Sequence, residues 1–195
     1  LRAAGFAATP GPPQSPTMHT DVLDFWFRDT DPRLWFATSA EFDAQIRDRF
    51  LRVLEQAAAG ELYEWRATAD GRLAEIIVLD QFSRNVFRGT PRAFAQDVIA
   101  LVLAQEAVAS GALAALDPTR RAFLLLPYMH SESPRVHAVA ERLYADHAPA
   151  ANHDYELRHK AIIDRFGRYP HRNAILGRTS TPEEIVFLQE PGSSF

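Results

Sequence analysis

The sequence contains no cysteine among its 195 residues. Disulfide bonds, thiolate metal sites and a cysteine nucleophile are therefore excluded. The absence fits a reducing compartment, and we expect a cytoplasmic location. We expect neither a metal nor another cofactor, because a metal site needs several ligands and no spacing such as H-E-x-x-H occurs.

Lysine is nearly absent as well. Lys160 is the single lysine, so 20 of the 21 basic residues are arginine. This bias weakens the significance of any one arginine, since a surface arginine in this chain often stands where another protein would have lysine. The formal net charge is −4, which argues against nucleic-acid binding because that function needs a basic surface.

Long apolar runs are missing too. A membrane helix requires roughly 18 apolar residues, whereas the longest run here extends over about seven, from Val98 to Ala104. No membrane partner is therefore expected. Residues 1–17 contain four prolines and no apolar signal-peptide core. We expect residues 1–17 to be a disordered leader and residues 18–195 to form a single all-helical domain.

The sequence also lacks the alternation and hairpin turns that predict β-strands. Signals for helix starts recur instead, in which a capping residue precedes a proline suited to the first helical position. The spacing further predicts two capping boxes, Thr38 with Glu41 and Thr181 with Glu184. The capping residue and proline pairs are Thr90-Pro91, Asp117-Pro118, Ser133-Pro134 and Thr181-Pro182.

Between these signals, apolar residues recur at helical spacing. We predict an all-α fold of about seven to nine helices packed as antiparallel neighbours. Glycines are expected to end three of the helices, at Gly60, Gly111 and Gly167. The predicted apolar faces are Phe42, Ile46, Phe50, Val53, Leu54 and Ala57; Phe94, Val98, Leu101, Val102 and Ala109; Leu73, Ile76, Ile77 and Val78; Val136, Val139, Ala140 and Leu143; and Tyr155, Ile162, Ile163 and Phe166.

The segment 166–178 combines aromatic and branched apolar residues with many hydrogen-bond donors. A solvated loop does not need the apolar residues, and a core segment must find a partner for every donor. Residues 165–178 contain four arginines and no acid, so an anion such as phosphate or carboxylate is a candidate ligand. The alternative is a structural lock in which Arg168 and Arg172 bind carboxylates elsewhere, such as Asp80 and Glu132. The two hypotheses are compatible.

A second polar segment covers residues 79–88. On a helix, Asp80, Arg84 and Arg88 share one face at i, i+4 and i+8 spacing. Asp80 can then form an ion pair with Arg84, which leaves Asn85 and Arg88 to face a ligand or another loop. The alternative is a semi-buried ion pair that only orients the end of the helix.

The third polar segment contains His130 and Glu132. These residues can form an acid/base pair or supply two metal ligands. The alternative is a loop network that caps helix ends. We expect the three segments to meet in space, because the arginines of the last segment need acids and the acids of the other two need cationic partners if they are buried.

The predicted site residues follow from this convergence. The predicted ligand-binding residues are Asp80, Arg84, Asn85, Arg88, His130, Glu132, Arg168, His171, Arg172, Asn173 and Arg178. The candidates for catalysis are His130, Glu132 and His171.

The motifs resemble those of the bacterial domain-of-unknown-function family number 924. The resemblance extends over about residues 21–190 and rests on segments 79–88, 127–132 and 166–178 in that order, followed by 180–184. It implies an all-helical fold similar to the tetratricopeptide-like superhelices. It implies no established activity.

Two functions are compatible with these features. In the first, the chain is a binding or scaffold protein that holds a small anionic ligand or a peptide on a concave face of stacked helices. In the second, it is an enzyme for a small anionic substrate, with His130 or His171 as acid/base and arginines as anion clamps. We favour binding, because no complete catalytic constellation can be identified in the sequence.

Overall fold

The computed structural model describes residues 18–194. Within this range the chain is helical and contains no strand, so the all-α prediction is confirmed. The expected leader lies outside the described residues. The single domain and the tetratricopeptide-like array stay predictions.

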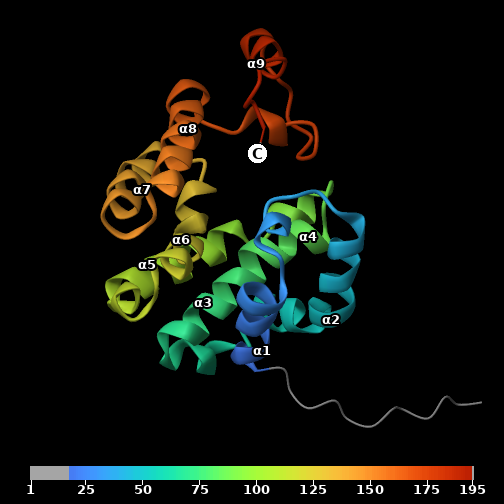
Figure 1. Cartoon of the computed structure of the whole chain (residues 1–195). Helices are drawn as coiled ribbons and strands as arrows, with labels where there is room; N and C mark the ends of the chain where they lie inside the picture. The colour runs from blue at the N-terminus through green and yellow to red at the C-terminus, as the bar shows by residue number, and fades with distance from the viewer. Residues whose placement is uncertain (1–17, 195) are drawn as a thin grey trace, which may run out of the picture.

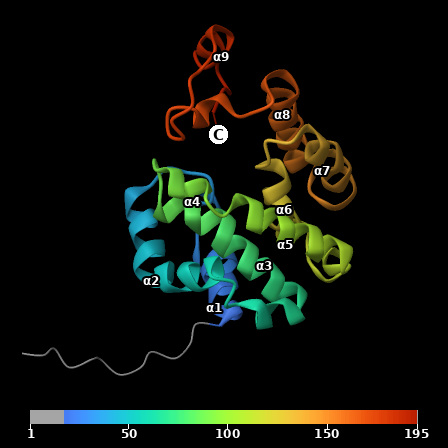
Figure 2. The same ribbon diagram turned by 180° about the vertical axis from the view of Figure 1, so that it is seen from behind.

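The helices form two groups with the C-terminal segment above them (Figures 1 and 2). Helices α1 to α4 lie on one side and α5 to α8 on the other, with α3 near the centre. The segment that leads to α9 lies between the end of α8 and α4. The helices are α1 (His19–Leu23), α2 (Ala40–Ala58), α3 (Ala69–Ile77), α4 (Ser83–Val86), α5 (Asp97–Ala109), α6 (Pro118–Met129), α7 (Pro134–His147), α8 (Ala150–Phe166) and α9 (Pro182–Phe187).

Each of the four predicted pairs of capping residue and proline begins a helix or a 3₁₀ turn, but the side chains of Thr90 and Ser133 make no capping hydrogen bond. The Asp117 side chain caps α6, and Thr181 with Glu184 forms the predicted capping box of α9. The box predicted at Thr38 is wrong, because Ser39 is the residue that caps α2. The chain turns into the helix one residue later than the pattern suggested. The three predicted stops, Gly60, Gly111 and Gly167, are left-handed at φ 75°, 77° and 68°.

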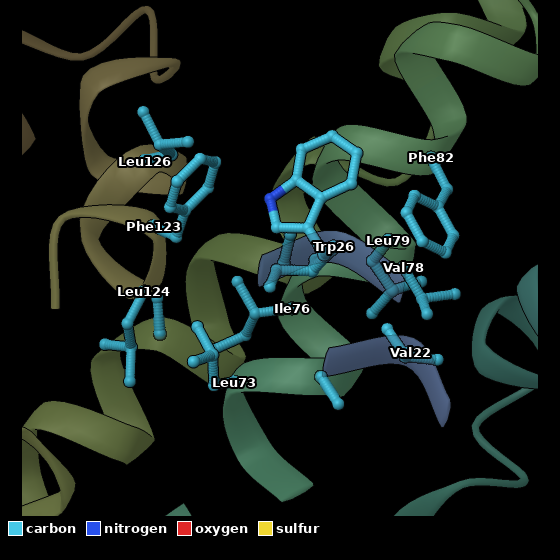
Figure 3. Close-up of a cluster of buried hydrophobic side chains, with 14 of the residues drawn as sticks. Val22, Trp26, Leu73, Ile76, Val78, Leu79, Phe82, Phe123, Leu124 and Leu126 are labelled. Atoms are coloured by element: carbon cyan, nitrogen blue, oxygen red, sulfur yellow. The ribbon is translucent and has the colours of Figure 1, made fainter. Parts of the chain in front are cut away.

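The main core is aromatic and centres on Trp26, which is fully buried. Figure 3 shows its indole ring between Phe123 of α6 and Phe82, the last residue of the π-helical turn that follows α3. The ring centroids lie 5.8 Å and 5.6 Å from that of Trp26. Helix α2 contributes its predicted apolar face, which is buried throughout. These residues are Phe42, Ile46, Phe50, Val53, Leu54 and Ala57.

The predicted face of α5 is wrong. Phe94 belongs to a preceding 3₁₀ turn, and Val98 and Val102 are 73% and 51% exposed. The helix is apolar on nearly every side, so periodicity does not define one buried face. Its small residues face inward and allow close packing. The buried residues of α5 are Ala100, Ala104 and Ala107.

Helices α7 and α8 match their predicted faces in part. Ala140, Ile162 and Ile163 are buried as expected, whereas Val139 and Tyr155 are exposed. Polar residues take the inward positions instead, which apolar periodicity cannot indicate. The buried polar residues of these helices are His137, Glu156 and His159.

Helices α3 and α4 are joined by a π-helical turn over Val78–Phe82. Asp80 lies in this turn, so the second polar segment begins inside a helix. Single π-helical turns within α-helices occur often at functional sites. The turn therefore marks this segment independently of its composition.

Candidate functional site

Three polar segments that are distant in the sequence meet near α4 and the C-terminal ends of α6 and α8 (Figure 1). His130 caps α6, and its Nδ1 lies 2.7 Å from Oδ1 of Asp80. Arg178 donates hydrogen bonds of 2.6 and 2.9 Å to the carboxylate of Glu132. These contacts join residues of segments 79–88, 130–132 and 168–178, as expected.

Asp80 is almost fully buried and bound on several sides. It pairs with Arg84 at 3.1 Å, as predicted, and accepts a hydrogen bond of 2.6 Å from Gln81. Burial acts to raise the pKa of Asp80, but Arg84 and His130 outweigh it and hold the pKa below its usual range. Asp80 is therefore ionised at neutral pH.

His130 is fixed by this carboxylate. Burial, followed by the charge of Arg84, lowers the pKa of His130 despite the nearby Asp80. The imidazole is thus neutral at pH 7, and the ionised Asp80 requires the proton on Nδ1. Nε2 is then left as a hydrogen-bond acceptor. The pair resembles the carboxylate–histidine part of a catalytic triad in its geometry only.

Two arginines share Asp97, the first residue of α5. Arg84 donates to both of its oxygens, at 2.9 and 3.0 Å. Arg172 makes only a longer contact of 3.3 Å, from Nη1 to Oδ2. The carboxylate also lies in the first turn of a helix, where negative charge is favourable.

Arg172 is a buried cation with few partners. The residue is 6% exposed, and its Nε is buried without a hydrogen-bond partner. Its Cζ lies over the rings of Phe94 and Tyr169, at 4.7 and 4.6 Å from their centroids. Burial, followed by the charge of Arg84, lowers the pKa of Arg172.

Residues 22–192 match the family described as bacterial protein of unknown function, DUF924. The chain belongs to the DUF924 family. Its structure is similar to that of a protein of unknown function, ATU0120, from Agrobacterium tumefaciens, with a TM-score of 0.83 and 38% identity over 88% of this chain and 96% of that one. A comparison with curated proteins found no match. The function must therefore be sought in the site itself.

The C-terminal loop of this DUF924 protein is held by Glu184 of its own segment and by Glu132, which follows α6. Arg168 binds Glu184 at 2.6 and 2.8 Å, and Asn173 donates to the same carboxylate at 3.2 Å. Arg178 reaches Asn173 at 2.9 Å as well as Glu132. The lock hypothesis named Asp80 and Glu132 as partners, whereas Arg168 binds Glu184 and Arg172 contacts Asp97.

Asn85 and Arg88 face α2 rather than the other polar segments. Arg88 binds Asp43 at 2.6 and 2.8 Å, and Asn85 donates to the same carboxylate at 2.8 Å. Burial acts to raise the pKa of Asp43, but the hydrogen bonds from Arg88 and Asn85 outweigh it and lower the pKa. These two residues therefore join α2 to the end of α4 through the carboxylate of Asp43.

His130 and Glu132 do not form an acid/base pair with each other, contrary to one of the expectations. Glu132 binds Arg178 and accepts a hydrogen bond of 2.8 Å from the backbone N–H of Tyr169. His171 lies beside the Tyr169 ring, at a centroid distance of 5.6 Å. Burial, followed by the charge of Arg172, lowers the pKa of His171 to about 4, so it is neutral at pH 7.

Sequence reasoning missed two acids, Asp43 and Asp97. Asp43 lies three positions before Ile46 on the buried face of α2. An acid on an apolar face is a signal for a paired carboxylate, because an unpaired one is costly to bury. The signal for Asp97 was weaker: it lies directly before the apolar run of α5, where an acid in the first turn of a helix is favourable.

Sequence reasoning also missed a buried pair between α7 and α8. His137 Nδ1 lies 2.7 Å from Oε1 of Glu156, and neither side chain is exposed. His137 Nε2 donates to the carbonyl of Ser131 at 2.8 Å, and the Tyr169 hydroxyl lies 3.3 Å away. The pair therefore fixes the loop that carries His130.

Two further properties bear on the site. Residues 18–194 hold no cluster of three or more His, Cys, Asp or Glu side chains arranged to bind a metal. In that same part of the chain, none of the helices combines the length and apolarity that a bilayer crossing demands.

Proposed function

We propose that this DUF924 protein binds a small anionic ligand at the Arg172 site, the cluster of Arg84, Asp97, His130 and Arg172. The observation that carries the proposal is the state of Arg172. Its guanidinium is buried, its Nε has no hydrogen-bond partner, and its ion pair is long at 3.3 Å. A buried charge costs free energy unless it is paired and hydrogen-bonded. An anion would supply the missing partner.

The contacts of the neighbouring Arg84 explain why Arg172 is the arginine that remains available to bind an anion. Arg84 engages both oxygens of Asp97 and also donates to the backbone carbonyl of Asp80 at 2.9 Å. Asp97 therefore has little capacity left for the second guanidinium. Asp80 and Asp97 balance the two cations, so the unused hydrogen-bonding capacity of Arg172, rather than a net positive charge, is what favours an anion here.

The Asp80–His130 pair supports a second candidate function, a small-molecule enzyme. A neutral imidazole held through Nδ1 by a buried carboxylate presents Nε2 as a general base. Arg172 would orient the anionic substrate beside it. His171 suits this role less well, because its pKa of about 4 makes it a weak base at neutral pH. The pair alone does not define a reaction, so binding remains the first proposal.

A peptide ligand receives less support, because the apolar cavity that could hold its side chains is not part of the Arg172 site. The structure has an apolar cavity of about 170 Å³ that shares no residue with the Arg172 site. It is lined by Trp35, Phe36, Thr119, Ala122, Phe123, Leu126 and Asn152.

A thermal-shift screen with small anions tests the proposal. A ligand at about 100 times its Kd adds about 2.7 kcal/mol of stability. For a chain of this size that raises the Tm by roughly 5–11 °C. We expect Arg172→Gln to abolish this rise. Arg88→Gln is the control that keeps it, since the Arg88 guanidinium is bound to Asp43. The proposal fails if no anion in the screen raises the Tm of the wild-type protein.

A further inference from the structure

Several arginines in this protein bind carboxylates through the Nε and Nη2 edge of the guanidinium, whereas Arg84 and Arg178 use Nη1 and Nη2. The Nε–H and Nη2–H groups form a fork that matches the two oxygens of a carboxylate. Three arginines use this fork with hydrogen bonds of 2.6 to 2.8 Å. They are Arg66 with Glu75, Arg88 with Asp43, and Arg168 with Glu184.

Arg172 does not use its fork in this way. Its contact with Asp97 is made by Nη1, at 3.3 Å, and its Nε has no hydrogen-bond partner. The fork therefore holds no two-oxygen partner from the described residues. The Nε–H and Nη2–H groups of Arg172 are the same donors that the other three arginines use, so they can bind the same kind of group, a carboxylate.

The aromatic rings restrict how a ligand can approach. The Cζ of Arg172 lies over the rings of Phe94 and Tyr169, so these two rings occupy space beside the guanidinium. The N–H groups of a guanidinium point outward in its own plane, so hydrogen bonds form at its edges. A carboxylate is planar and can lie in that plane, whereas a phosphate places oxygens above and below it. Both groups can bind the fork through two oxygens, but only the carboxylate places no further oxygens toward the neighbouring rings.

The charges around the site favour a monoanion. Asp80 and Asp97 balance Arg84 and Arg172, and the pKa of His130 is lowered, so the imidazole adds no charge at pH 7. A bound carboxylate would leave one excess negative charge in a largely buried place. A phosphate dianion would leave two, at a higher electrostatic cost.

We infer that the ligand of the Arg172 site carries a carboxylate. Its two oxygens accept hydrogen bonds from Nε and Nη2 of Arg172, beside the rings of Phe94 and Tyr169. The inference rests on the proposed anion-binding function and specifies its ligand class. The carboxylate would make a fork of the kind that Arg66, Arg88 and Arg168 already form.

The test is a titration of the ¹⁵N-labelled protein at pH 7, followed through the arginine Nε–H signals in NMR spectra. Acetate and benzoate are the carboxylate probes, and inorganic phosphate is the comparison. The Arg172 signal is assigned through its bonded connectivity to the backbone. The Arg66 signal is the internal control, because its fork is filled by Glu75.

We expect both carboxylates to shift the Arg172 signal in a saturable way and to leave the Arg66 signal in place. Arg172→Lys keeps the charge but removes the fork, so it should weaken carboxylate affinity at least about tenfold. Arg88→Lys should leave the affinity unchanged.

Three outcomes overturn the inference. If phosphate shifts the Arg172 signal and the carboxylates do not, the ligand class is wrong although anion binding stands. If no probe shifts it, both the inference and the proposed function fail. If the Arg66 and Arg172 signals shift alike, the effect is not specific to the site.

Discussion

The aromatic core around Trp26 and the C-terminal segment 168–194 are stabilised in different ways. The core is formed by rings and aliphatic side chains from α1, α2, α3 and α6. The C-terminal segment has a small apolar cluster of its own and is otherwise held by ion pairs. Its apolar residues, with those of α8, are Ile162, Ile163, Tyr169 and Phe187.

The difference lies in how specific each interaction is. Apolar burial is not directional, so any well-fitted side chain contributes in proportion to its buried area. An ion pair or hydrogen bond depends on one partner and one geometry. Changes in the core should therefore scale with the volume removed, whereas changes in the C-terminal segment should depend on which partner is left behind.

The largest expected effect is that of Trp26→Ala. Removing this fully buried indole from among Phe42, Phe82 and Phe123 leaves a large cavity. We expect a loss of about 5 kcal/mol, the upper end for such a change. The free energy of unfolding in urea measures it. Phe36→Ala, at a ring that is 70% exposed, should cost far less. Equal losses would contradict the assignment of Trp26 to the centre of the core.

His137→Ala should come second, with a loss of about 3 kcal/mol. The substitution leaves Glu156 buried without its partner, which is costlier than losing the pair as a whole. The double variant His137→Leu with Glu156→Leu should therefore recover part of the stability, as measured by urea unfolding. If the double variant is less stable than His137→Ala, partner loss is not the cause.

Arg172→Ala should lower the Tm in ligand-free buffer by a smaller amount. The variant loses the contacts of Arg172 with Phe94 and Tyr169, but Asp97 keeps both hydrogen bonds from Arg84. The loss should be about 1–2 kcal/mol, below the about 3–5 kcal/mol for breaking a fully buried pair. An unchanged Tm would favour a site organised for ligand binding alone over one that also locks the fold.

Mild acid should have the smallest effect. Burial lowers the pKa of His159 to about 3 and that of His171 to about 4. An unfolded histidine has a pKa near 6.5, so the unfolded chain binds more protons as the pH falls from about 6.5 toward 4. Stability is therefore full above pH 6.5 and decreases below it, by less than about 1 kcal/mol per histidine at pH 6.

Urea unfolding at pH 7 and pH 6 measures this dependence. His159→Gln does not titrate in this range and should reduce the pH dependence. An unaltered dependence in this variant would show that His159 is not the group responsible.

Sequence reasoning succeeded where local spacing determines a contact or a buried face, and it failed where tertiary packing determines them. Helix α2 was predicted well because its apolar face alternates with polar residues, whereas α5 is apolar on most sides and gave the wrong face. In the polar segments, the Asp80–Arg84 pair followed from helical spacing and was confirmed. Pairs between distant segments, such as Arg88 with Asp43, depend on the tertiary packing of α2 and α4. No spacing along the chain encodes them.

The contact between Asp97 and Arg172 joins positions that are 75 residues apart. Closing so long a loop costs more entropy than pairing neighbours such as α6, α7 and α8, so contacts of this kind form late in folding. We therefore expect the two helical groups to assemble first and the segment carrying Arg172 to dock onto them last. During synthesis, Arg84 and Arg172 cannot come together until the last quarter of the chain has been made. The proposed anion could therefore bind at the Arg172 site only when folding is nearly complete.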